Sequence, residues 1–462
     1  MTDATDVRAV AATPGPAADD ETVPKTWLRR GALAMVLAAL WFLPINFAVI
    51  GGQVRVAYMV LLAVALVCAL VQLSRGDSVV VVVLATLAVS MVIQLLNGGS
   101  LKLSALLLGQ LLAGAALQRR LSGPIAIPMF LAVSTSVSLV VDLLVHDHVY
   151  MSLFAAQIFT ARLDEGFRAR GLIGQPVPAA HLMAGLLAYL WVVTSALTSS
   201  RRTAARVSIA LMAVATLYST GTRSALITAA VCILLIVVER RLAGSKLSPV
   251  GLVRAVFVGL VLVVAAVVVF GNSLSESRLL SFDMLEGTDS LTVRSAGLDF
   301  VTGLPDDCFS CVMTGHGQGA LQDEVRASSI VSSVSTLDNQ YLSAYWDFGI
   351  VGLVALLAIG LVAVRRLLRS AELPVRAGAV GVLGVLVAGA FYDTLYLSTG
   401  AILVGFLLAS MTRPPARRAA RADAGSAAGE YLTVPMASPP VLAPGGGLAQ
   451  ITAGAVRLTP SK

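Results

Sequence analysis

The 462-residue chain is far more apolar than a water-soluble protein: 57% of its residues are hydrophobic, 13% are charged, and the mean hydropathy is +0.85. A soluble domain carries about a quarter charged residues. The net charge of +7 does not indicate nucleic-acid binding, because no basic stripe is interleaved with aromatic residues. Composition therefore excludes an ordinary soluble enzyme and favours a protein built from membrane-crossing helices.

Apolar runs follow one another along most of the chain. Residues 1–30 are rich in Ala, Pro and Asp and predict a disordered cytoplasmic N-terminal tail. The runs that follow each approach the roughly 20 residues that cross a bilayer core. They predict about 12 spans, near 32–50, 54–73, 78–96, 101–117, 124–145, 179–197, 205–219, 223–238, 251–270, 341–364, 376–396 and 398–411. Residues 412–462 predict a disordered cytoplasmic C-terminal tail. We therefore expect an all-α fold, a polytopic transmembrane helical bundle over residues 31–411.

Basic residues are distributed unevenly over the short loops, and this bias predicts the orientation of a membrane protein. One set of alternate loops holds only Arg55, Lys102 and Arg223. The other set holds Arg75, Arg119, Arg120, Arg201, Arg202, Arg206, Arg240, Arg241, Lys246, Arg365, Arg366, Arg369 and Arg376. We therefore expect a multi-pass protein of the inner (cytoplasmic) membrane with both termini in the cytoplasm.

One outer segment, residues 271–340, is long enough to form a large extracytoplasmic loop carrying short helices, and most of its charged residues are acidic. Cys308 and Cys311 lie in it as CFSC. An oxidising compartment favours a disulfide between them, and two cysteines fall short of the four ligands of a structural zinc site. The sequence therefore predicts a disulfide here, no metal site and no cofactor.

Few arginines are predicted on the outer face, and each is a candidate for binding an anion. They are Arg223 in YSTGTRSALI, Arg294 in SLTVRSAGLDF, and Arg168 and Arg170 in RARG. A guanidinium group offers a rigid fork of donors to phosphate oxygens. The alternatives are an interfacial anchor for Arg223 and an ordinary salt bridge for Arg294.

Two further stretches combine polar residues with glycines. Residues 315–319 read GHGQG, whose alternating glycines predict a tight structural turn, with His316 as its second residue. Residues 337–352 read LDNQYLSAYWDFGIVG: Asp338 and Asn339 open an apolar, helix-like run. The glycines at 349 and 352 lie one turn apart and predict close helix packing.

These motifs together resemble the O-antigen ligase / O-antigen polymerase family of bacterial inner-membrane glycan-joining enzymes. The ligases carry His, then Asn, Ser or Gln, and after a fixed gap Gly-x-x-Gly. Here Asp338 stands in the histidine position, and residues 340–348 separate Asn339 from Gly349-Ile350-Val351-Gly352. TGTRSAL is similar to the family's Ser-Arg-Gly signature, and the run from Arg294 through Pro305 to GHGQG is similar to its Arg…Pro…Gly-x-Gly block. RARGLIGQPVPAA resembles its Arg-x-x-Gly segment, so the resemblance covers about 165–360.

The resemblance implies transfer of a glycan from a polyprenyl-diphosphate donor to a glycan or lipid acceptor in the membrane, without a nucleotide or a required metal and with inversion. It implies that Arg223 and Arg294 bind the diphosphate, with Arg170 or Arg168 as a third cation, and that Asn339 and His316 contact substrate. Asp338 would be the proton acceptor or would only orient the acceptor, and the protein would be a ligase or a polymerase.

Two other classes of protein remain open at this stage. A twelve-span polysaccharide or lipid transporter would have polar or broken helices at the middle of the membrane. A non-catalytic cell-wall scaffold would not need the arginines.

Overall fold

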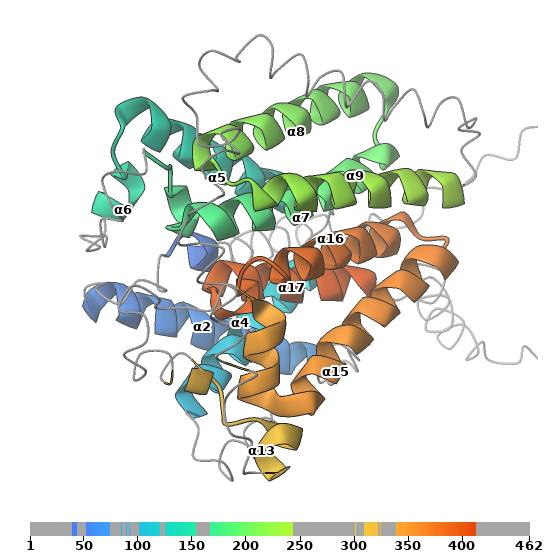
Figure 1. The fold of residues 1–462 in the computed structure, drawn as a ribbon. Helices are drawn as coiled ribbons and strands as arrows, with labels where there is room; N and C mark the ends of the chain where they lie inside the picture. The colour runs from blue at the N-terminus through green and yellow to red at the C-terminus, as the bar shows by residue number, and fades with distance from the viewer. Residues whose placement is uncertain are drawn as a thin grey trace, which may run out of the picture. The chain divides into compact units, whose positions relative to one another are not determined.

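The structure is a computed structural model of the chain, and it describes residues 39–43, 52–73, 101–120, 125–153, 167–243, 309–321 and 339–412 together with a few isolated positions. Every element in these residues is a helix (Figure 1). The all-α prediction is confirmed at this level. Both tails, the predicted span at 251–270, and most of the spans at 32–50 and 78–96 and of the outer loop at 271–340 lie outside the described residues.

The helices are labelled as in Figure 1. In chain order they are α2 (Gly52–Leu73), α4 (Leu101–Arg120), α5 (Ala126–Val145), α6 (Val149–Leu153), η2 (Gly171–Ile173), α7 (Pro176–Val193), η3 (Thr194–Ala196), α8 (Ser199–Thr220), α9 (Ser224–Leu242), α13 (Phe309–Thr314), α15 (Gln340–Arg369), α16 (Leu373–Gly389), η5 (Thr394–Tyr396) and α17 (Ser398–Met411).

Several of these helices are apolar enough to indicate a membrane protein. Four are also long enough to cross a bilayer, namely Ala126–Val145, Pro176–Ala196, Ser199–Thr220 and Gln340–Arg369. Shorter apolar helices occupy Arg55–Val67, Leu103–Gln118, Leu373–Gly389 and Ser398–Met411. All of them coincide with predicted spans. The helix α8 begins at Ser199, before the predicted start of the span at 205. Its first turns carry arginines, which a helix accepts but a bilayer core does not, so the helix is longer than the apolar run.

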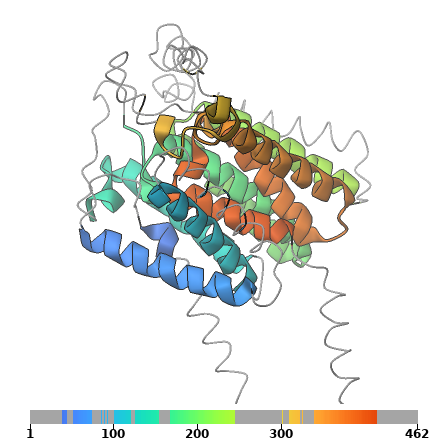
Figure 2. The ribbon, with the colours of Figure 1, turned by 90° about the horizontal axis from the view of Figure 1, so that it is seen from below.

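Helix α7 lies at the centre of the bundle. In its apolar stretch 83% of the residues are buried by other parts of the chain, against 28% in α8 and 22% in α15. It contacts α5, α8, α9, α16 and α17, and α16 in turn contacts α9, α15 and α17, as Figure 2 lets the reader follow. A helix that is apolar on every face needs such surroundings.

The outer helices expose large apolar side chains. Leu211 of α8 is 65% exposed and Leu361 of α15 is 71% exposed. Contiguous exposed apolar surface of this kind is rare on soluble proteins. These faces therefore indicate a membrane protein.

Glycines allow a close helix crossing between α4 and α17. A Cβ atom added at Gly114 would overlap the carbonyl oxygen of Ile402, and one added at Gly405 would overlap that of Leu111. Between membrane helices, small residues of this kind let backbones approach closely. The crossing is therefore fixed by backbone contact on both sides.

Helix α15 is bent at Gly349, which corrects the prediction of one continuous span at 341–364. Gly349 has φ 66° and ψ −161°, so α15 consists of two limbs, 340–348 and 350–369 (Figure 1). At 1.5 Å per residue the second limb is about 30 Å long, which is the thickness of a bilayer core. The second limb alone can therefore cross the membrane, and the first limb is a separate helix at its end.

Candidate functional site

The segment that carries Arg168 is docked on the turn between α8 and α9. The Ala169 N–H donates to the Ser219 carbonyl oxygen at 3.0 Å. The Arg168 guanidinium donates from Nε to the Thr220 carbonyl oxygen at 2.8 Å and from a terminal nitrogen to the Thr222 hydroxyl at 3.0 Å. Arg168 therefore holds the turn that leads directly to Arg223, which brings together two motifs that the sequence separates by fifty residues or so.

A buried carboxylate holds the next residues of the same segment. Asp142 of α5 is fully buried, and its Oδ2 accepts the backbone N–H groups of Arg170 at 3.1 Å and Gly171 at 2.8 Å. Burial lowers the pKa of the Arg170 guanidinium below its ordinary value, while the neighbouring Asp142 charge opposes that shift. Sequence reasoning missed Asp142, although an ionisable residue inside an apolar run is a signal of a special role.

Arg223 is half-buried and immediately precedes α9. The next residue, Ser224, lies 3.0 Å from Nε2 of the fully buried His181, and Thr228 of α9 lies 2.8 Å from its Nδ1. The imidazole also stacks on the ring of Phe391, with centroids 5.6 Å apart. His181, which sequence reasoning also missed, therefore connects the start of α9 to the turn between α16 and α17.

That turn connects the starts of α7 and α15. The Tyr392 hydroxyl donates to the side-chain oxygen of Gln175, the residue before α7. The buried Asp393 accepts a hydrogen bond of 2.7 Å from the Ser343 hydroxyl, in the first limb of α15. The side-chain oxygen of Gln340 accepts the backbone N–H of Leu395 at 2.7 Å. The turn therefore contacts both the residue before α7 and the first limb of α15, two separate parts of the predicted site.

Asn339 caps the N-terminus of α15. Its Oδ1 accepts the backbone N–H groups of Tyr341 at 2.9 Å and Leu342 at 3.3 Å, and its own backbone is extended. Asparagine is among the preferred residues at this position, because the first amides of a helix have no partner within it. Asn339, predicted to bind substrate, thus uses its side-chain oxygen to cap a helix.

The GHGQG turn packs against the bend of α15. The carboxylate of Asp347, which is 1% exposed, accepts the backbone N–H groups of Gly319 at 2.9 Å and Leu321 at 3.1 Å. A Cβ atom at Gly315 would overlap the Asp347 carbonyl, and one at Gly349 would overlap the backbone of Met313. The close approach predicted for Gly349 is therefore to the end of α13, the short helix directly before this turn.

His316 lies on the face of Trp346. Their ring centroids are 4.1 Å apart with an interplanar angle of 15°, and the His316 backbone N–H donates to the Trp346 carbonyl oxygen at 2.9 Å. Trp346 is buried and belongs to the first limb of α15. The imidazole is therefore held at a fixed place beside that limb.

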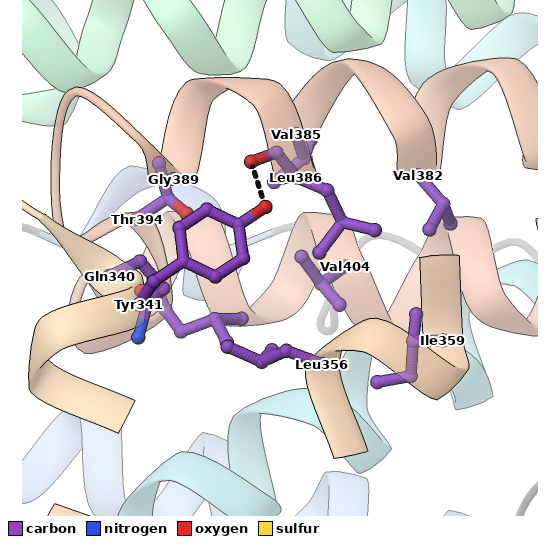
Figure 3. Close-up of a pocket in the computed structure, with 11 residues that line it drawn as sticks. Gln340, Tyr341, Leu356, Ile359, Val382, Val385, Leu386, Gly389, Thr394 and Val404 are labelled. Carbon is purple, nitrogen blue, oxygen red and sulfur yellow. Dashed lines mark hydrogen bonds between the residues drawn. The ribbon is translucent and has the colours of Figure 1, made fainter. Parts of the chain in front are cut away.

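A small apolar cavity of about 30 Å³ lies in the angle between the two limbs of α15, against α16 and α17 (Figure 3). Tyr341 crosses it, and its hydroxyl donates to the Leu386 carbonyl oxygen at 2.8 Å. Its lining is Gln340, Tyr341, Leu356, Ile359, Val382, Val385, Leu386, Gly389, Thr394, Leu395 and Val404.

Four helices, α7, α9, α15 and α17, begin at this end of the bundle, so their positive dipole ends lie on the same side as the arginines. Arg168, Arg170 and Arg223 are brought together there. Asp338 and Arg294 lie outside the described residues, as does Cys308. Cys311 is disulfide-bonded. Among the described residues, no three His, Cys, Asp or Glu side chains are grouped to hold a metal ion.

Comparison with known proteins finds no family model that matches this chain and no matching curated protein.

Proposed function

We propose that this chain is a membrane glycosyltransferase of the O-antigen ligase or polymerase kind, which joins a glycan from a polyprenyl-diphosphate donor to a glycan or lipid acceptor. The observation that carries the proposal is the position of its predicted motifs. The RARG segment, the TGTRSAL turn and the start of α15 are linked by hydrogen bonds at one end of an apolar bundle.

The donor side of the reaction needs positive charge at the level of the lipid headgroups. A diphosphate leaving group develops negative charge, which preorganised cations and helix N-termini stabilise. Arg223 and Arg170 stand at such a place, with Arg168 fixing the turn between them. Arg294 completes this cluster in the proposal.

The acceptor side needs a proton acceptor near the anomeric carbon. Asp338 directly precedes the N-cap Asn339 in the sequence. A carboxylate can act as a base, and in an apolar setting its pKa rises towards the working pH. His316, stacked on Trp346, would contact the sugar near the same limb.

In the proposed topology the chain crosses the cytoplasmic membrane twelve times. The 271–340 loop and the arginine cluster lie outside, and both termini lie inside. The basic residues of the described loops support this arrangement: Arg376 pairs with Glu239 at 2.9 Å and Arg206 lies beside Trp191, at the bundle end remote from Arg223.

The bend of α15 does not favour a transporter. Broken helices of transporters place their break near the middle of the membrane, where it binds the cargo. Here the limb after Gly349 is long enough to span by itself, and the end of α13 and the GHGQG turn pack against the break. The break therefore fits the membrane boundary better than its centre.

The first test is glycan transfer from a purified lipid-linked donor to an acceptor by the protein in lipid nanodiscs. Arg223→Lys keeps the charge and loses the planar fork, so turnover should fall about 10²–10³-fold. Arg55→Lys is the matched control, since Arg55 is an exposed arginine predicted on the same face, and it should retain activity. Normal transfer by Arg223→Lys and Arg223→Ala would remove the basis of the proposal.

The second test separates the base from the donor site. Asp338→Asn should abolish transfer and leave donor binding intact, because the amide keeps the shape but does not take up a proton. Asp338→His, which restores the family residue, should recover part of the activity. Transfer at the wild-type rate by Asp338→Asn would exclude the base role.

A further inference from the structure

A cluster of arginines surrounds Trp191 at the end of the bundle remote from Arg223. The Cζ atom of Arg206 in α8 lies 5.3 Å from the centre of the Trp191 ring, and that of Arg240 in α9 lies 5.7 Å from it. Arg202 of α8 is close enough for its charge to repel both. Two helices, α8 and α9, therefore bring guanidinium groups to one indole on a third, α7.

Little negative charge offsets this cluster within the described part of the chain. Glu239 is buried beside it and its charge attracts Arg206 and Arg240, but this single carboxylate also pairs with Arg376 at 2.9 Å. Arg202 donates to the Leu197 carbonyl oxygen, and Arg206 donates to the Ser195 hydroxyl at 2.9 Å, both of which are neutral acceptors. Like charges at this distance destabilise the protein unless a counter-charge binds. The cluster thus has an excess of positive charge.

Two buried donors in the same place have no acceptor. Within the residues that the structure describes, neither the Trp191 Nε1–H nor the Arg206 Nε–H makes a hydrogen bond. Buried polar groups are nearly always hydrogen-bonded, and an exception calls for an explanation. A ligand with negative charge and several oxygen acceptors would satisfy both donors and the arginines together.

The cluster lies at a membrane boundary. Trp191 is near the end of the span Pro176–Ala196, and Arg206 is near the start of the span Ser199–Thr220. The first span ends in η3, and only Leu197 and Thr198 separate it from the second. Tryptophan and arginine are both typical of this level, where phospholipid phosphates are also located.

We propose that Trp191, Arg206 and Arg240 form a binding site for a phosphate-bearing anion at the membrane boundary remote from Arg223. The Arg206 and Arg240 guanidinium groups supply the charge, and the Nε1–H of Trp191 and the Nε–H of Arg206 each donate to a phosphate oxygen. The headgroup of an anionic phospholipid and free phosphate share this chemistry. The site does not depend on the proposed glycan transfer.

The test measures lipid binding to the purified full-length protein by native mass spectrometry. Phosphatidylglycerol should bind more tightly than the zwitterionic phosphatidylcholine. Arg206→Gln and Trp191→Phe should each weaken phosphatidylglycerol binding about fivefold or more. Trp191→Phe is the conservative variant, because it keeps an aromatic ring and removes only the N–H donor. Arg201→Gln is the matched control, since this exposed arginine begins the same helix, and it should change binding less than about twofold.

A second arm identifies the source of the phosphate. Inorganic phosphate is added to delipidated protein at constant ionic strength, and thermal stability is recorded against chloride. Stabilisation that both site variants lose, without selective lipid binding, assigns the site to free phosphate. If neither probe distinguishes wild type from both variants, or if Arg201→Gln weakens binding as much as Arg206→Gln, the proposal is wrong. The donors would then be satisfied by another part of the chain, or the arginines would act only as general surface charge.

Discussion

Replacement of Asp347 by asparagine should release the GHGQG turn from the bend of α15. The carboxylate accepts two backbone N–H groups, and it is 1% exposed, so water does not substitute for it. In Asp347→Asn one oxygen still accepts, but the amide NH₂ faces the other N–H. Loss of a buried, charge-assisted bond and of its acceptor costs about 2–4 kcal/mol in total. We expect the free energy of opening the turn to fall by that amount.

Hydrogen exchange of the amides in the turn measures this opening directly. A loss of about 2–4 kcal/mol corresponds to exchange that is roughly 30 to 700 times faster at Gly319 and Leu321. Asp147→Asn is the control, because the exposed Asp147 carboxylate accepts only the backbone N–H of His148, at 2.7 Å. It should change local exchange less than about threefold. Unchanged protection of Gly319 and Leu321 in Asp347→Asn would show that the carboxylate does not hold the turn.

Three further predictions concern the bend, the helix cap and the topology. Gly349→Ala should lower stability by about 2 kcal/mol or more in thermal unfolding, because its positive φ and its contact with the Met313 backbone leave no room for a Cβ. Gly360→Ala should not lower the stability in this way, because the added Cβ meets only the flexible end of a leucine side chain. Equal losses of stability in the two variants would contradict this account. Asn339→Ala should cost about 0.5–2 kcal/mol and Asn339→Ser much less; loss of activity without loss of stability in both would instead indicate substrate contact. In intact cells, a cysteine introduced at Ser329 should be labelled by an impermeant reagent and one at Ser426 should not, and the reverse pattern would overturn the proposed topology.

The positions of the helices were largely predictable from the sequence, because apolar runs of a given length leave few alternatives in a membrane. The bend at Gly349 was not. A glycine that breaks a helix and a glycine that packs against a neighbour both occur in the same apolar run. Only the partner, here the backbone of Met313 and Thr314, distinguishes them. That partner lies at the end of α13, distant in sequence from Gly349, and periodicity does not identify it.

The candidate site was likewise predictable from the sequence only in part. Arginines on a face that carries few of them were conspicuous in the sequence, and the structure brings Arg168 and Arg223 to one turn. The residues that position them were not predicted. His181 and Asp142 act through contacts with Ser224 and with the backbone of Gly171, and such pairs depend on how helices pack. Their only signal was polarity within an apolar run.

The turn between α16 and α17 has a consequence for how the two halves of the proposed site communicate. Phe391 and Tyr392 contact residues of the α7 side, while the next residue, Asp393, contacts Ser343 of α15. A ligand that displaces the turn on the α7 side must therefore also disturb its contact with α15. By thermodynamic reciprocity, the factor by which bound donor changes acceptor affinity equals the factor by which bound acceptor changes donor affinity. Titrating each substrate in the presence of the other should give the same coupling factor, and Ser343→Ala should bring that factor closer to one.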